Sequence, residues 1–185
     1  MLINRKVVAI VNEGYHHLEL MTPIQALQDA GATVIVAGVK PEHIMVGVSD
    51  HLSYKLPVEQ RKEMIKLKAA KLINEIDAAD FDALLLPGGH APGTLRIIPE
   101  VLALVKTMYA LKKTIGAICH GPQILISAGL VKGKDLTCAE NMVDDLINAG
   151  AIYLDEPLVV DGNIISSRTP GDLTVFSNAL VAALQ

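Results

Sequence analysis

The chain has 185 residues, of which 51% are hydrophobic, 19% are charged and 3% are aromatic, and its formal net charge is −4. This composition is typical of a globular protein with a substantial core and excludes a disordered chain. The negative charge gives no reason to expect nucleic-acid binding, and no apolar run approaches the length of a membrane span. We expect a single domain, residues 1–185, in the cytoplasm.

Short apolar runs alternate with amphipathic segments along most of the chain. The apolar runs predict buried strands at residues 7–11, 33–37, 83–86 and 114–118. The amphipathic segments predict helices at residues 18–29, 58–76, 99–112 and 121–131. Gly31 suits the C-terminal cap of the first helix, and Pro99 suits the first turn of the third.

The last third of the chain is less regular. A short strand at residues 136–138 and a short helix at 142–149 are predicted, followed by a hairpin with an Asp161-Gly162 turn. Thr169 and Pro170 predict the start of a last helix, and a short extra strand or hairpin is expected within residues 39–56. The alternation predicts an α/β fold, with a mainly parallel sheet and helices on both faces.

The fourth predicted strand ends at Cys119, in a segment that reads Cys-His-Gly-Pro-Gln. Small residues around a residue at a strand end are typical of a nucleophile elbow, a sharp turn that presents one side chain above the sheet. The positive end of the following helix should stabilise a thiolate and lower the pKa of the thiol. We predict that Cys119 is a nucleophile rather than an inert core cysteine, and that Cys138, which lacks this context, is a core residue.

His120 is a candidate proton acceptor, because Cys–His pairing activates thiols, although adjacency in sequence does not by itself place its ring on the sulfur. The third predicted strand ends in Gly88, Gly89 and His90. The N–H groups of the two glycines, with the amide of His120, are candidate oxyanion donors, and His90 is a candidate cleft residue. The alternative for this segment is a plain glycine turn.

The loop after the first strand should lie at the same edge, because the carboxyl ends of parallel strands meet there. It contains Glu13, His16 and His17, and Glu19 follows in the first helical turn. Glu19 could reach the thiol of Cys119, or it could be an ordinary acid of a first turn. Adjacent histidines point apart, and no carboxylate–histidine spacing completes a site, so we expect no metal and no cofactor.

These segments resemble the ThiJ/PfpI superfamily, and specifically its single-domain PfpI-like branch, over roughly residues 6–184. The matching segments are Asn12-Glu13, Leu18-Glu19-Leu20, Phe81-Asp82-Ala83, Pro87-Gly88-Gly89 and residues 117–125, 144–150, 160–163 and 167–170. The resemblance implies a flavodoxin-like three-layer sandwich, as in class-I glutamine amidotransferases, and a homodimer or higher homo-oligomer. An amidotransferase itself is disfavoured, because no histidine follows His120.

The resemblance also implies residue roles. Cys119 would be the nucleophile, His120 its partner and Glu19 the carboxyl group bonded to the thiol. The amides of Gly89 and His120 would be the oxyanion donors. The residues expected in or near the cleft are Glu13, His16, Gly88, His90 and Arg168.

The chain departs from its relatives at two positions. Gly93 stands where peptidase-like relatives carry a Glu that completes a triad across a subunit contact, and Ala139 stands where relatives carry a tyrosine. Both differences count against a peptidase, unless Glu140 or Asp144 replaces the missing acid.

Three functions fit the candidate site. The first is a cofactor-independent, cysteine-dependent glyoxalase or deglycase that acts on methylglyoxal, glyoxal or their adducts. The second is an intracellular cysteine peptidase, and the third is an oxidation sensor or stress chaperone in which Cys119 becomes a sulfinic acid. We expect the first function, with a small aldehyde as the substrate. A peptidase would instead take a peptide substrate. We expect no binding to nucleic acid or to a membrane.

Overall fold

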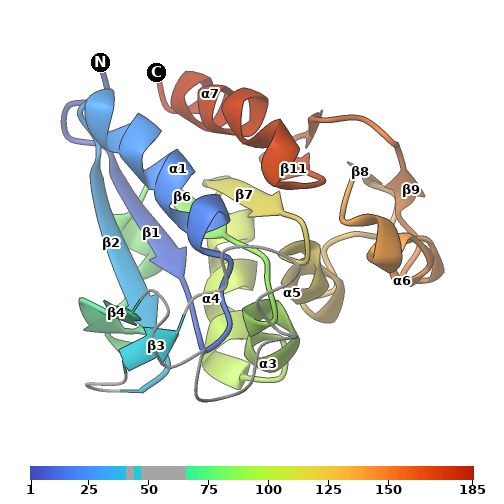
Figure 1. The fold of residues 1–185 in the computed structure, drawn as a ribbon, viewed down its shortest axis with the longest axis horizontal. Helices are drawn as coiled ribbons and strands as arrows, with labels where there is room; N and C mark the ends of the chain where they lie inside the picture. The colour runs from blue at the N-terminus through green and yellow to red at the C-terminus, as the bar shows by residue number, and fades with distance from the viewer. Residues whose placement is uncertain (41–43, 47–65) are drawn as a thin grey trace.

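The computed structural model describes residues 1–40, 44–46 and 66–185 (Figure 1). A seven-stranded sheet forms its centre, in the order β10-β11-β7-β6-β1-β2-β5. Its strands are β1 (Lys6–Ile10), β2 (Thr33–Gly38), β5 (Lys71–Leu72), β6 (Ala83–Leu86), β7 (Thr114–Ile118), β10 (Val159–Asp161) and β11 (Ile164–Ser167). Neighbouring strands are parallel except for the antiparallel edge pair β10–β11.

Helices cover both faces of this sheet. α1 (His17–Asp29) and α7 (Leu173–Ala183) lie side by side on one face, and α4 (Pro99–Ala110) packs on the other, against β6 and β7 (Figure 1). The short helices α3 (Ala91–Leu95) and α5 (Pro122–Ser127) pack against each other near α4. Burial on both faces explains why the central strands read as continuous apolar runs. The predicted flavodoxin-like three-layer α/β sandwich is confirmed.

Smaller units flank the main sheet. β3 (Ile44–Val46) pairs with β4 (Lys66–Lys68), and β8 (Asp135–Leu136) pairs with β9 (Ile152–Tyr153) beside α6 (Val143–Asn148). Short 3-10 turns occupy Ile73–Glu75, Ala78–Asp80, Glu140–Met142 and Pro170–Asp172. β3 is the extra strand expected within residues 39–56, of which residues 41–43 and 47–56 lie outside the described part.

The helix predicted at residues 58–76 is wrong where the structure describes it. Residues 66–76 contain β4, β5 and a 3-10 turn, and residues 58–65 lie outside the described part. Lys71 and Leu72 of the edge strand β5 pair with β2, and Ile73 is buried in the core. Backbone pairing and burial therefore override the helical spacing of the apolar residues.

The hairpin turn differs from the prediction by one residue. Asp161 pairs with Ile164, so the two turn residues are Gly162 and Asn163 rather than Asp161 and Gly162. Asp161 is held in its strand because its carboxylate accepts a 2.6 Å hydrogen bond from Nζ of Lys134.

Two other predicted elements are shorter in the structure, and one helix was not predicted. The strand expected at 136–138 ends at Leu136, although Cys138 is fully buried, in agreement with its predicted place in the core. α5 ends at Ser127 because Gly129 adopts a left-handed conformation with φ of +73°. α3 was not predicted because Pro92 and Gly93 are typical of loops, although proline is tolerated in a first helical turn.

The strand order places the loops after β1, β6, β7 and β11 at one edge of the sheet. From β1 the chain continues to β2 on one side and later returns to β6 on the other. Such a switch of direction opens a crevice at the carboxyl ends of the strands, where ligands bind in open α/β sheets. Within the ranges that the structure describes, none of the helices combines the length and apolarity needed to cross a membrane.

Candidate active site

Cys119 directly follows β7 and has a left-handed backbone, with φ of +60°. This conformation costs a residue with a side chain about 1–3 kcal/mol, so neighbouring contacts must hold it. The N–H of Cys119 donates to the carbonyl of Ser167 at 3.0 Å, and its carbonyl accepts from the N–H of Ala139 at 3.0 Å. Gly121 is needed in the same turn, because a Cβ there would collide with the carbonyl oxygen of Leu86. The sharp turn expected from the sequence is present.

The imidazole of His120 contacts the sulfur of Cys119, with 3.1 Å between Sγ and Nδ1. The thiol can donate to an unprotonated Nδ1, and a protonated Nδ1 can donate to a thiolate, so a proton can pass between them without rearrangement. The backbone N–H groups of Gly89 and His120 also hydrogen-bond to Cys119. The two amides predicted as oxyanion donors therefore converge on the atom that would attack a substrate.

Glu19 lies in the first turn of α1 and is fully buried. Its Oε2 accepts a 2.8 Å hydrogen bond from the backbone N–H of Gly88, and its carboxyl also hydrogen-bonds with Cys119. The contact between Glu19 and Cys119, which the sequence left open, is therefore present in the structure.

Burial raises the pKa of Glu19 from its ordinary 4.5 to about 8, although the hydrogen bonds from Gly88 and Cys119 act in the opposite direction. Burial also raises the pKa of the Cys119 thiol, and a negative charge on Glu19 raises it further. The N–H groups of Gly89 and His120 lower that pKa by less. The low thiol pKa predicted from the helix dipole is therefore wrong, because α5 is only six residues long and burial dominates.

A protonated Glu19 favours reaction at the sulfur. At neutral pH Glu19 keeps its proton, so it exerts no charge repulsion on the sulfur of Cys119 as that sulfur becomes a thiolate. The thiol itself must lose its proton to His120 as it attacks.

The two glycines after β6 allow this close packing. A Cβ on Gly88 would lie 2.6 Å from Oε2 of Glu19 and 2.8 Å from Cβ of Cys119. Gly89 adopts φ of +82° and forms a backbone bridge with Tyr15. The loops after β1 and β6 are therefore tied together, which holds the carboxyl group beside the sulfur.

Three other cleft candidates lie around this bridge. His16 is the N-cap of α1, and its Nδ1 accepts a 3.4 Å hydrogen bond from the N–H of Glu19. His90 is exposed, and its N–H donates to the carbonyl of Gly14 at 2.8 Å. Glu13 is exposed in the same loop. Their roles toward a substrate stay predictions.

Arg168 follows β11 but is engaged in ion pairs. Its Nε donates to Asp172 at 3.0 Å, and its Nη1 donates to Asp155 at 2.8 Å. The bond to Asp172 ties the end of β11 to the turn before α7, and the bond to Asp155 ties it to the segment between β9 and β10. The described contacts therefore indicate a structural part for Arg168, and its place in the cleft stays a prediction.

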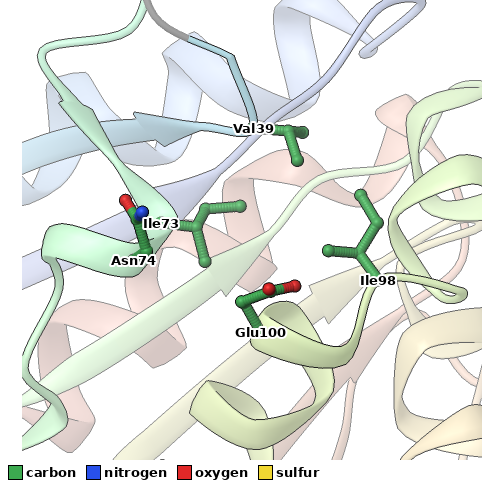
Figure 2. A pocket seen from close by; sticks show the side chains of 5 residues that line it. All are labelled: Val39, Ile73, Asn74, Ile98 and Glu100. Atoms are coloured by element: carbon green, nitrogen blue, oxygen red, sulfur yellow. The ribbon is translucent and has the colours of Figure 1, made fainter.

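A pocket lies apart from this site (Figure 2). Its lining residues come from the end of β2, the turn after β5 and the start of α4, and they are Val39, Ile73, Asn74, Ile98 and Glu100. None of the predicted site residues lines it. Across the described residues, no group of three or more His, Cys, Asp or Glu side chains is arranged to hold a metal ion. The candidate site is therefore identified by the set of hydrogen bonds that the Cys119 sulfur makes with its neighbours.

Comparison with known proteins agrees with this architecture. Residues 5–183 match the family model described as the DJ-1/PfpI family. The chain belongs to the DJ-1/PfpI family. The putative cysteine protease YraA of Bacillus subtilis is 38% identical to it over 95% of each chain. The deglycase TK1284 of Thermococcus kodakarensis is 38% identical over 97% of this chain and 99% of its own.

A solved structure with the same fold contains an additional domain. It is a two-domain protein from Anabaena variabilis with DJ-1/ThiJ/PfpI-like and ferritin-like domains, and it is 35% identical with a TM-score of 0.88. The match covers 97% of this chain, which spans 48% of that protein. The DJ-1/PfpI fold therefore accounts for nearly the whole of the present chain.

Gly93 and Ala139 are the two residues whose identities count against a peptidase. Gly93 is exposed on α3 and supplies no acid. Ala139 is buried, and its N–H holds the carbonyl of Cys119. The possible replacement acids, Glu140 and Asp144, are both exposed.

Two backbone supports of the elbow were not predicted. The carbonyl of Ser167 and the N–H of Ala139 reach Cys119 from segments far along the chain. Backbone groups carry no sequence signal of their own, and only the family motif that contains Ser167 pointed to this region.

Proposed function

We propose that this chain is a cofactor-independent, cysteine-dependent glyoxalase or deglycase that acts on methylglyoxal, glyoxal or their adducts. The observation that carries the proposal is the 3.1 Å contact between Sγ of Cys119 and Nδ1 of His120, with the Glu19 carboxyl bonded to the same cysteine. A small dicarbonyl requires a nucleophile, a proton shuttle and an oxyanion site. The name of the Thermococcus relative, a deglycase, supports the same class of reaction.

The first step forms a hemithioacetal. The thiol proton of Cys119 passes to Nδ1 of His120 while the sulfur attacks the aldehyde carbon of methylglyoxal. The carbonyl π bond breaks, and the resulting oxyanion is stabilised by the N–H groups of Gly89 and His120. The imidazolium then returns its proton to that oxygen, so His120 ends the step neutral.

The later steps are an internal oxidation and reduction. Glu19, as a carboxylate, removes the proton from the former aldehyde carbon; the electron pair forms a carbon–carbon double bond, and the neighbouring carbonyl oxygen becomes an enediolate oxygen. The proton of the hemithioacetal hydroxyl moves to that oxygen, and Glu19 returns its own proton to the neighbouring carbon. The oxygen that has lost its proton then becomes the carbonyl of a thioester on Cys119. Water then cleaves the carbon–sulfur bond, which releases lactate and restores the thiol, so methylglyoxal plus water gives lactate with no external oxidant.

The test is lactate formation from methylglyoxal by the wild type, Cys119→Ala and Cys138→Ala. Each variant removes one buried thiol, but of the two only Cys119 has an imidazole on its sulfur. We expect Cys138→Ala to retain the wild-type rate and Cys119→Ala to fall to the background rate. Lactate formation that persists in Cys119→Ala would contradict the proposal.

A cysteine peptidase is the second candidate, because the Bacillus relative is named a putative cysteine protease. Amide cleavage requires an imidazolium that protonates a poor leaving group, and an acid normally orients that ring. Gly93 stands where the peptidase-like relatives place this acid, which favours the aldehyde substrate. A labelled unfolded protein incubated with the same two variants separates the candidates: Cys119-dependent cleavage without lactate formation would support the peptidase.

An oxidation sensor would use the same sulfur. A peroxide would oxidise the thiolate of Cys119 to a sulfenic and then a sulfinic acid, with one peroxide reduced to water at each step. Peptide mass spectrometry after peroxide treatment locates the product. Sulfinic acid at Cys119 but not at Cys138, in a protein that makes no lactate, would favour the sensor.

A further inference from the structure

His16 faces one carboxyl oxygen of Glu19, Oε1. Oε2 of Glu19 accepts from Gly88, whereas Oε1 is buried and has no hydrogen-bond partner among the residues that the structure describes. Nδ1 of His16 lies 4.0 Å from this Oε1. The side chain of His16 is 5% exposed and that of Glu19 is 0% exposed, so bulk water has little access to the pair.

Glu19 must be a carboxylate to take a proton from the hemithioacetal carbon. Burial raises its pKa to about 8, so at neutral pH most molecules hold Glu19 in the protonated form. A proton acceptor beside Oε1 would resolve this conflict. Nδ1 of His16 accepts the N–H of Glu19, so in the neutral ring this nitrogen carries no proton and has a lone pair.

We propose that His16 is a positioning residue that shares one proton with Glu19. The proton leaves Oε1 for Nδ1, which gives a carboxylate and an imidazolium inside the site, and it returns after the substrate carbon has been reprotonated. The long 3.4 Å bond from the Glu19 N–H is given up during the transfer, and a small rotation of the two side chains closes the 4.0 Å gap. This role rests on the proposed function, because it supplies the base that the glyoxalase steps require.

Other titratable groups belong to the same loop as His16 and to the elements that end at this edge of the sheet. They are Glu13, Tyr15 and His17 from the same loop and α1, His90 from the end of β6, and Cys119 and His120 from the end of β7. Cys119 and His120 contact each other, and His120 holds the thiol proton during attack. Burial raises the pKa of Tyr15 and lowers that of His17, so both are neutral near neutral pH. The 4.0 Å separation from Oε1 makes His16 the ring positioned for the exchange.

The first test is the pH profile of His16→Asn. Asparagine is a favoured N-cap residue, so it can keep the bond to the N–H of Glu19, but it cannot take up a proton. At neutral pH we expect kcat for lactate formation to fall roughly tenfold with KM unchanged, because only about a tenth of Glu19 is ionised without a partner. The rates should converge as the pH rises past about 8, where solvent deprotonates Glu19.

The outcomes distinguish a failure of the proton sharing between His16 and Glu19, here called the relay, from a failure of the proposed function. A wild type that makes no Cys119-dependent lactate overturns the proposed function. An active wild type whose pH profile is matched by His16→Asn overturns the relay and leaves the proposed function standing. A uniform loss at every pH, with a lowered Tm, also overturns the relay, because it indicates that His16 only caps α1.

The second test needs neither activity nor a variant of His16. The ring carbons of His16 are followed by NMR during a pH titration of the wild type and of Glu19→Gln. Proton sharing predicts a step in the His16 shifts at the pH where Glu19 ionises, and the loss of that step in Glu19→Gln. His16 titration curves that are the same in both proteins overturn the proposal.

Discussion

The backbone N–H of Gly88 donates a 2.8 Å hydrogen bond to Oε2 of Glu19, a residue 69 positions earlier in the chain. This bond joins the first turn of α1 to the end of β6 and fixes a buried carboxyl group beside Cys119. The bond favours the ionised carboxylate, but burial has the larger effect, and the pKa of Glu19 rises to about 8. A buried acid that is neutral near neutral pH is therefore part of the folded state.

The stability of the protein should fall with rising pH because of Glu19. The unfolded chain releases this proton near 4.5, whereas the folded chain holds it up to about 8. Between these values the folded state binds more protons, so each pH unit costs roughly 1.4 kcal/mol of the free energy of unfolding. Glu19→Gln lacks this dependence, and urea unfolding should show its stability rising relative to wild type from about pH 5 to about pH 8.

Glu100→Gln, which removes an exposed carboxylate on α4, is the matched control for the loss of one acidic group. If the stability curves of wild type and Glu19→Gln run parallel over this pH range, Glu19 is not a buried neutral acid.

Gly88→Ala should strongly reduce Cys119-dependent turnover. The new Cβ would lie 2.6 Å from Oε2 of Glu19 and 2.8 Å from Cβ of Cys119, so the carboxyl or the elbow must move. Overpacking of this kind typically costs about 1–3 kcal/mol of stability as well. We expect lactate formation to fall by roughly a hundredfold, in line with the contribution of a misplaced acid–base group.

Gly93→Ala is the control for that substitution. Among the described residues its Cβ would meet only Oε1 of Gln123, at 3.7 Å, and alanine favours the helix α3. Wild-type activity with unchanged or slightly raised stability is expected. Equal activity in Gly88→Ala and Gly93→Ala would show that the crowding at Gly88 does not matter.

Arg168→Gln distinguishes a structural arginine from a cleft residue. The substitution removes the ion pairs with Asp172 and Asp155, which are partly exposed, so we expect a small loss in the free energy of unfolding, measured by urea unfolding. KM for methylglyoxal should stay within a factor of about two, since partly exposed ion pairs contribute mainly to folding. A several-fold rise in KM with unchanged stability would instead place Arg168 in the cleft. Asp155→Asn, which breaks only the more exposed pair, should have the smaller effect on stability.

The sequence predicted the elements whose signals are local. The central strands are buried on both faces, so β1 and β6 read as apolar runs, and Gly31 closes α1 in a left-handed conformation. The helix expected at residues 58–76 failed because β5 forms only through pairing with β2, a contact that residue spacing cannot report. The same holds for the one-residue error at Asp161, which its contact with Lys134 keeps in β10.

In the candidate site, too, features with a local sequence signal were predictable and features that depend on distant contacts were not. The turn at Cys119 was predictable, because small residues after an apolar strand are a local pattern. The direction of the thiol pKa was not, since it depends on burial and on Glu19, which arrives from another element. The approach of His16 Nδ1 to Oε1 of Glu19 was also not predictable, because it depends on how α1 begins in the folded chain.

Cys119 and Cys138 form an internal comparison. They are 3% and 0% exposed, and burial raises the pKa of both thiols. An imidazole contacts the thiol of Cys119, with 3.1 Å between Sγ and Nδ1 of His120. Any difference in reactivity between the two thiols therefore reports on His120 and the elbow rather than on burial alone.

The most direct measurement is the rate at which iodoacetamide modifies each cysteine of the folded protein at neutral pH, followed by peptide mass spectrometry. We predict that Cys119 reacts at least roughly tenfold faster than Cys138, and that His120→Gln removes most of this difference. Equal rates for the two cysteines, or a Cys119 rate unaffected by His120→Gln, would contradict the claim that Cys119 is an activated nucleophile.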